Sequence, residues 1–228
     1  MKERPILFSA PMVRAILEGR KTVTRRIVKP VRGYEDCSTC RPDKAAASHS
    51  VWWHGRFENV GVMQDCPYGK RGDRLWVRET WYCNHFEVQK GPYLQPADMV
   101  DLDQAREDGD LVYAADGLTP YEQEQPTWKP SIHTPRWVSR ILLEITDVRV
   151  ERLQDISDEQ AQAEGIIPHV RGGWHWHSHN PQDMDDWHQF GFKTPVWAFH
   201  DLWVGINGAD NWDANPWAWV VEFKRVKP

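Results

Sequence analysis

The sequence predicts an α+β fold built on a small, mostly antiparallel, PUA-like β-barrel with short flanking helices and long inserted loops. Two observations lead to this prediction. The period-two alternation of half-buried strands occurs at 72–79, 137–150 and 217–225. The helical patterns between these strands are short and lack the regular crossovers of a parallel α/β fold. Because 228 residues suit one domain, we expect 1–228 to form a single unit.

Near the N-terminus, the sequence predicts a helix followed by a strand. Ser9 is a suitable N-cap, Pro11 fits the first helical turn, and Gly19 is placed to end the helix. The β-branched residues of 20–28 then favour a strand. Three polar or irregular segments lie outside the main pattern, and we interpret them as insertions or long loops: 31–65, 84–126 and 167–192.

The C-terminal half predicts a long strand, two helices and a final strand. In 137–150, Ile141 and Ile145 share one face, and an irregularity is expected at Asp147. Ser157-x-x-Gln160 has the spacing of a capping box for a short helix that ends at Gly165. A second helix opens at Thr194-Pro195 and is expected to close near Gly205. The last strand turns three apolar side chains to one face: Trp219, Val221 and Phe223.

The composition excludes several classes of protein. The chain contains neither the run of roughly 20 apolar residues that a membrane span needs nor a signal-peptide core, so we expect a cytoplasmic protein without a membrane partner. Four Cys are too few for a disulfide scaffold. The 14 Trp can fill a core, and some can offer flat faces on which bases stack.

Charge is distributed unevenly along the chain. Residues 1–33 hold nine Lys and Arg against two Glu, whereas 97–125 hold nine acidic residues and one Arg. A basic patch on an acidic body argues against coating of long nucleic acid and favours a local site for a nucleotide or a short strand. Alternatively, the basic residues face solvent, or the two segments pair with each other.

The densest polar cluster is Gly-Arg-Lys-Thr-Val-Thr-Arg-Arg at 19–26. Its ammonium, hydroxyl and guanidinium groups suit an anionic ligand or a polarised carbonyl. Lys21 can act as a nucleophile or base if burial or neighbouring cations lower its pKa. By spacing alone, the segment could equally be a basic edge strand that discourages aggregation. The candidate substrate-binding residues of the cluster are Arg20, Thr22, Arg25 and Arg26.

The motif Gly-Arg-Lys-Thr-x-Thr-x-Arg after a helix resembles the signature of the ASCH domain, a member of the PUA-like superfamily. The strands opening at Gly72 and spanning 141–150, the helix motif of 153–165 and the aromatic C-terminal strand follow in ASCH order. The resemblance covers about half of the chain and excludes 31–65, 84–126 and 167–192. Further segments are similar to a phage and prophage subgroup: Cys66–Gly69, Gly72–Glu79, Trp128–His133 and Asn215–Trp217.

The resemblance implies a barrel that binds RNA or a nucleoside in a cleft. One ASCH branch comprises bacterial amidohydrolases that release acetate from N(4)-acetylcytidine. Their Lys and Thr match Lys21 and Thr24, and their catalytic Glu matches Glu164. The implied activity is amide hydrolysis without metal or cofactor. Two alternatives remain: a metal-independent ribonuclease acting on single-stranded RNA, and a non-catalytic RNA- or nucleotide-binding or accessory phage protein whose Trp-rich surface binds a host or phage protein.

Amide hydrolysis predicts that Lys21 and Glu164 meet across one cleft. A Lys crowded by arginines gains from a carboxylate partner, and the pair can divide acid and base roles while Thr24 stabilises the oxyanion. A regular strand would put Lys21 and Thr24 on opposite faces, so either a bulge or a site that starts before regular pairing is needed. As a cleft-edge group, Glu164 should be replaceable by Gln with folding nearly intact. The alternative is an ordinary exposed acid beside Gly165.

Further candidates lie outside this cluster. His133 could line the cleft with Arg136 and Arg140, or it could be a core histidine with its hydrogen bonds satisfied. Cys37-x-x-Cys40 has the knuckle spacing of a zinc site, but no second close pair follows, so reduced thiols are favoured. The further ligands to consider there are His54, Cys66 and Cys83. The three His of 174–179 suit either a mobile loop or a metal site.

Overall fold

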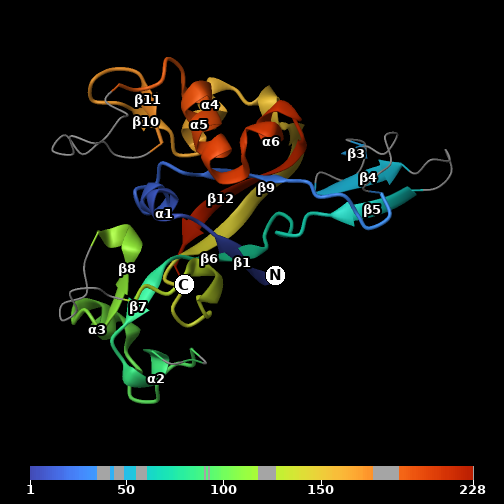
Figure 1. Cartoon of the computed structure of the whole chain (residues 1–228). Coiled ribbons are helices and arrows are strands. Elements are labelled where there is room, and N and C mark those ends of the chain that lie inside the picture. Colours follow the sequence, from blue (N-terminus) through green and yellow to red (C-terminus); the bar gives the residue numbers. More distant parts are fainter. Residues whose placement is uncertain are drawn as a thin grey trace.

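A five-stranded sheet forms the centre of the computed structural model (Figure 1). The model describes residues 1–34, 42–43, 49–54, 61–89, 91, 93–117, 127–176 and 190–227. The strands of the sheet, in spatial order, are β1 (Glu3–Leu7), β6 (Arg74–Arg78), β9 (Leu142–Arg152), β12 (Trp217–Val226) and β2 (Val23–Ile27). The pairing of β1 with β6 is parallel, and the other three pairings are antiparallel. The predicted α+β class with mostly antiparallel sheets is therefore confirmed.

All four predicted strand segments contribute a strand to this one sheet, but residues 137–141 precede β9 and are not part of it. β1 joins them as a strand that the sequence pattern did not reveal. The irregularity expected at Asp147 is a register shift in β9. Glu222 pairs with Asp147, and the next residue, Phe223, pairs with Ile145, so that Thr146 is left out of the ladder. The extra residue keeps the apolar side chains of β9 on one face. Backbone pairing between the described strands leaves β1 and β2 as edges and does not close a barrel.

The helices largely follow the sequence signals. The first, α1 (Ala10–Leu17), begins after Ser9, and the turn at Gly19 has a φ of +74°. In α4 (Asp158–Ala163), both hydrogen bonds of the predicted capping box are present. The helix α5 (Pro195–Asn207) continues past Gly205, since a helical glycine costs only about 1 kcal/mol when the surrounding turns are packed. The short helix α6 (Ala209–Asp213) follows it.

The predicted insertions contain regular structure, so their interpretation as loops was wrong in part. Within 84–126, Asp101 caps a helix by accepting hydrogen bonds from two backbone N–H groups, and a strand there pairs with residues just before the segment. These elements bury their own small apolar cluster, which includes Trp81 and Tyr113. The elements are β7 (Trp81–Cys83), α2 (Phe86–Gln89), α3 (Leu102–Glu107), β8 (Leu111–Tyr113) and a 3₁₀ turn (Ala114–Asp116).

The other two insertions contribute small sheets at the periphery of the central one (Figure 1). Residues 31–65 include β3 (Pro42–Asp43), β4 (Ser50–His54) and β5 (Gly61–Asp65). Residues 167–192 include β10 (Ile167–Pro168) and β11 (Trp174–His175). Two more 3₁₀ turns lie between the predicted strands and helices, at Ser131–His133 and Leu153–Asp155.

The main core lies between α1 and one face of the central sheet, where Val13 and Ile16 pack with β-strand residues. A second core joins α4 and α5. Tryptophan mostly serves these interiors: Trp53, Trp81, Trp203 and Trp219 are buried, whereas Trp52 and Trp197 are exposed. None of the helices in the described part of the chain has the length and apolar character needed to cross a bilayer.

Candidate functional site

Lys21 and Glu164 are in direct contact, as the sequence predicts, although they come from opposite halves of the chain. They do not face each other across a cleft: the contact is buried, and Lys21 is not among the residues that line the cavity. The Lys21 Nζ donates to the Glu164 Oε2 at 2.5 Å and to the Glu164 carbonyl oxygen at 2.9 Å. Lys21 lies before the first residue of β2, where its backbone N–H bonds to Ala15 rather than to a strand. The site therefore starts before regular pairing, which is how Lys21 and Thr24 reach one region.

A glycine lets the end of α4 approach this turn. Gly165 has a φ of +105°, and a Cβ there would lie 3.1 Å from the Ala15 Cβ and 3.4 Å from the Lys21 Cβ. The backbone N–H of Thr22 also donates to the Ala163 carbonyl at 2.9 Å. Glu164 caps the C-terminus of α4 in this close contact and is only 4% exposed. Its interpretation as an ordinary exposed helix acid is therefore wrong.

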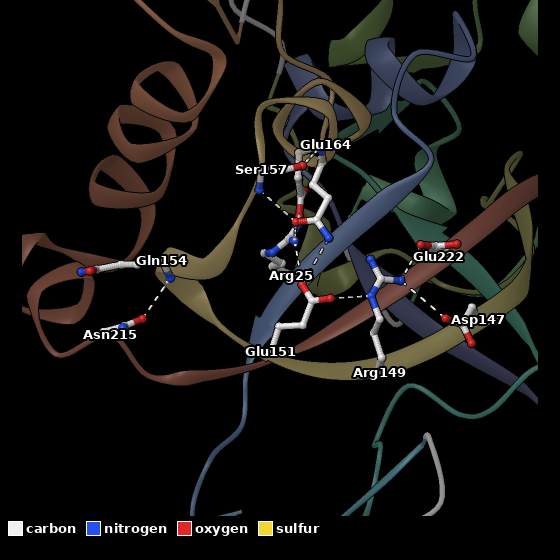
Figure 2. Close-up of polar contacts among 10 residues, drawn as sticks. Arg25, Asp147, Arg149, Glu151, Gln154, Ser157, Glu164, Asn215 and Glu222 are labelled. Atoms are coloured by element: carbon white, nitrogen blue, oxygen red, sulfur yellow. Dashed lines mark hydrogen bonds and ion pairs between the residues drawn. The ribbon is translucent and has the colours of Figure 1, made fainter. Parts of the chain in front are cut away.

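Arg25 is held against the same carboxylate (Figure 2). Its Nη1 lies 3.5 Å from the Glu164 Oε1. Its Nη2 donates to the Gln160 Oε1 at 2.9 Å and to the Glu151 Oε2 at 3.1 Å. The Gln160 oxygen also accepts from the Ser157 backbone N–H at 3.0 Å, so the capping box of α4 helps to fix Arg25. We name Lys21, Arg25 and Glu164 the cavity cluster.

The cavity cluster combines deep burial with incomplete hydrogen bonding. The side chains of Lys21 and Arg25 are 0% exposed. Burial lowers the pKa of Lys21, the carboxylate of Glu164 opposes that shift, and the charges of Arg25 and Arg26 add to it. Within the described residues, no hydrogen bond reaches the Glu164 Oε1 or the Arg25 Nε and Nη1. Such groups are costly to bury unless a ligand or water completes them.

An open cavity of about 620 Å³ lies in front of this cluster. Glu164, Arg25 and Thr24 form part of its wall, whereas Lys21 lies behind Glu164 and is not among the lining residues. The cavity also lies between the two edges of the central sheet, because the end of β1 and most of β2 line it. The Arg26 Nη2 bridges these edges by donating to the Leu7 carbonyl at 2.5 Å. Aromatic side chains complete the lining: Phe8, Tyr68, Phe199 and Trp203.

Comparison of this chain with protein-family models, curated proteins and solved structures found no match. The side chains around the cavity define the chemistry that is available there. One carboxylate oxygen is fixed by Lys21, and the other accepts no hydrogen bond within the described residues. Hydroxyl residues, among them Thr24, line the same space, together with the guanidinium residues Arg25 and Arg26 and the ammonium residue Lys29. This set can abstract a proton from water and stabilise a developing negative charge on oxygen.

The other predicted site residues lie outside the cavity lining. Arg20 donates to Glu18 and to the Gly165 carbonyl. Thr22 is exposed and lines a separate hollow of about 210 Å³ on the other side of the strand. His133 is exposed beside the Tyr93 ring, which corrects its interpretation as a core histidine.

Arg136 and Arg140 are also separate from the cavity lining. Arg136 is exposed and pairs with Glu3 at 3.2 Å. Arg140 is engaged by two carboxylates, those of Glu79 and Asp116. The ion pairs of residues 1–33 within the described part of the chain are made with acids outside the acidic segment 97–125.

Sequence reasoning missed Gln160, Glu151 and the aromatic lining. A signal for Gln160 was present: it lies four residues before Glu164 on one helix, and such residues share a face. Glu151 required knowledge that β9 and β2 both pair with β12, which places its side chain near Arg25. The aromatic lining depends on how α5 packs, which no local pattern specifies.

Only some of the candidate zinc ligands belong to the described residues. Cys37, Cys40, His177 and His179 lie outside the described residues. Cys66 and Cys83 are buried free thiols, and burial raises the pKa of Cys66 to about 11. Within the described residues, no group of three or more His, Cys, Asp or Glu is arranged to hold a metal ion.

Proposed function

We propose that this protein hydrolyses the amide of an N(4)-acylated cytidine, in the manner of the ASCH amidohydrolases that its sequence resembles. One observation carries the proposal. Glu164 lines the cavity and is 4% exposed; Lys21 fixes one of its oxygens, and the other lies 3.5 Å from the Arg25 Nη1 and accepts no hydrogen bond within the described residues. A carboxylate in such a partly dehydrated position is suited to act as a general base.

The proposed reaction uses water as its second reactant. The Glu164 Oε1 takes a proton from water as the oxygen attacks the acyl carbon, and the carbonyl oxygen becomes negatively charged. Thr24 and Arg25 line the cavity and stabilise that charge. Glu164 then returns the proton to the cytosine N4 as the C–N bond breaks, releasing cytidine and the carboxylic acid. Lys21 is a positioning residue, since it lies behind Glu164 and orients its carboxylate.

The size and lining of the cavity support a nucleoside substrate. A volume of about 620 Å³ falls within the range of small-molecule sites, which spans roughly 300–1,000 Å³. Phe8, Tyr68, Phe199 and Trp203 offer apolar and aromatic surface on which a base can pack. The position of the cavity between β1 and β2 also supports a PUA-like barrel that stays open on one side, with its ligand between the two edges.

Two other functions are outcomes of the same test. The cations that line the cavity would also stabilise the transition state of RNA cleavage, and the aromatic lining would serve binding without turnover. Incubation of the purified protein with N(4)-acetylcytidine and with single-stranded RNA separates the three. Acetate and cytidine support the amidohydrolase, shortened RNA supports the ribonuclease, and binding without product supports a binding module.

Two matched variants sharpen this experiment. Thr24→Val removes a hydroxyl that lines the cavity, and its turnover should fall about 100-fold, as when an oxyanion donor is lost. Thr22→Val makes the same chemical change two residues earlier, outside the cavity lining, and should retain the activity. Equal losses in the two variants would contradict the assignment of Thr24, and N(4)-acetylcytidine that stays intact would contradict the proposed function.

A further inference from the structure

The N-terminus of α1 opens into the cavity without a cap. Ser9, Ala10 and Met12 line the cavity. Ser9 occupies the N-cap position, yet its side chain makes no capping hydrogen bond, and the first turn holds no acidic residue. The backbone N–H groups of Ala10 and Met12 donate no hydrogen bond within the described residues. Within the described residues, these N–H groups and the helix dipole therefore form a positive end that has no hydrogen-bond acceptor, and such ends bind anions.

Cationic side chains lie along the same cavity. Arg26 donates to the Leu7 carbonyl through one nitrogen, while its Nε has no hydrogen bond within the described residues. Lys29 lines the cavity, is exposed, and forms no ion pair in the described part of the chain. The fully buried Arg25 belongs to the same wall: its Nη1 lies 3.5 Å from the Glu164 Oε1, and its Nε has no hydrogen bond within the described residues. The helix N-terminus is thus accompanied by a buried, incompletely bonded guanidinium that also points to a missing acceptor.

The described residues that line the cavity carry a net positive charge. Glu164 is the one acid among the described lining residues, and it already faces Lys21 and Arg25. Among the described lining residues, no carboxylate is therefore left to balance the charges of Arg26 and Lys29. An anion with several acceptor oxygens would satisfy the helix N-terminus and these cations together.

We infer that the end of the cavity formed by Ser9, Arg26 and Lys29 binds a phosphate group of the substrate. The inference rests on the proposed function and narrows its substrate to an acylated cytidine that carries phosphate. The phosphate can be the monoester of a nucleotide or the diester of a short RNA, since both present oxygens to the same donors. Free nucleoside would leave this end of the cavity empty.

Calorimetry of binding tests the subsite without relying on turnover. Cytidine 5′-monophosphate should bind at least about tenfold more tightly than cytidine, and that advantage should shrink from about 50 to 200 mM salt. A short cytidine-containing RNA with internal diesters only distinguishes the two phosphate sources. Tighter binding of the mononucleotide assigns the monoester, and tighter binding of the RNA assigns the diester. Equal binding of cytidine and both phosphate forms would overturn the inference.

Ser9→Asp separates a binding role from a structural one. Aspartate is a good N-cap, so the melting temperature should stay the same or rise, while its charge should repel phosphate and reduce the preference for the nucleotide about tenfold. Lys29→Gln should also lower that preference. The matched control is Lys224→Gln, because Lys224 is exposed, pairs with Glu144 and lies outside the cavity lining.

The outcomes distinguish this inference from the proposed function. If acylated cytidine is hydrolysed with the same kcat/KM whether or not it carries phosphate, the hydrolase stands and the subsite is refuted. If the nucleotide binds with the expected preference and no acyl group is released, the subsite stands and the hydrolase is refuted. An unchanged nucleotide preference in both Ser9→Asp and Lys29→Gln would also refute the subsite.

Discussion

Two ion-pair clusters of this protein, each built around a buried glutamate, consist of the same kinds of residue, acidic and basic, but differ in how completely they are hydrogen-bonded. In the cavity cluster of Lys21, Arg25 and Glu164, one carboxylate oxygen and two guanidinium nitrogens have no hydrogen bond within the described residues. In the second, which we name the saturated cluster, Arg140 donates to both oxygens of Glu79 at 3.0 Å and to both of Asp116 at 2.8 Å.

In the saturated cluster, each carboxylate oxygen of Glu79 and Asp116 accepts a hydrogen bond from Arg140. The Arg140 guanidinium also stacks over the Tyr113 ring at 3.9 Å. Burial acts to lower the pKa of Arg140, yet its hydrogen bonds and charge pairing with Glu79 and Asp116 raise that pKa above the usual value. The sequence-based prediction that Arg140 binds substrate depended only on its being an arginine. The completeness of hydrogen bonding, rather than burial or charge, separates a structural ion pair from a candidate site.

The largest expected effect is the loss of turnover in Glu164→Gln. The variant keeps the shape of the side chain and removes the base, so kcat should fall about 10²- to 10⁴-fold. The sequence predicted nearly intact folding for this change, but the 4% exposure of Glu164 corrects that expectation. Without the carboxylate, the buried ammonium of Lys21 loses its charge partner, and stability should fall as well.

A double variant separates the two effects of Glu164→Gln. Adding Lys21→Met removes the buried ammonium, so the midpoint of urea denaturation should recover while turnover stays low. Turnover by Glu164→Gln within a factor of two of the unchanged protein would show that Glu164 is structural and that the two clusters do not differ in role.

The sequence predicts the strands and the central contact better than the cavity. Alternation of apolar residues in 217–225 and in the part of 137–150 that forms β9 is enforced by one buried face, so it is kept in the folded sheet. The contact between Lys21 and Glu164 follows from charge complementarity and from the family resemblance. Of the two carboxylate partners of Arg140, Asp116 could not be predicted, because it lies in a segment interpreted as a loop. The cavity depends on the packing of α1 and α5, which is a property of the whole fold.

The second prediction concerns stability. Glu79→Gln breaks the saturated cluster at its most buried member, whose side chain is 1% exposed, and should cost about 3–5 kcal/mol of unfolding free energy. Arg140 keeps Asp116 as a partner, which favours the lower end of that range. Chemical denaturation measures the loss, and turnover below the transition should match that of the unchanged protein. A loss of turnover without a loss of stability would reverse the roles assigned to the two clusters.

The smallest expected effect is a dependence of stability on alkaline pH that belongs to the cavity cluster. Burial lowers the pKa of Lys21 below its usual 10.5, so between the folded pKa and 10.5 the unfolded chain holds a proton that the folded protein has released. Stability due to this group therefore rises with pH in that window, by at most about 1.4 kcal/mol per pH unit, and is constant outside it. Lys21→Met should lack this rise.

Subtraction isolates the contribution of Lys21. Burial raises the pKa of Cys66 to about 11 and that of Tyr113 to about 12, so both groups make stability fall at high pH, in the variant as in the unchanged protein. Urea denaturation gives the free energy of unfolding at each pH. The value for the unchanged protein minus the value for Lys21→Met, followed from neutral pH to pH 10.5, should increase with pH. Glu79→Gln supplies the contrast: its partner Arg140 stays charged throughout, so its difference curve should be flat. A Lys21 difference that decreases with pH would mean that Glu164 outweighs burial and raises the pKa of Lys21, which would make the cavity cluster an ordinary stabilising ion pair like the saturated one.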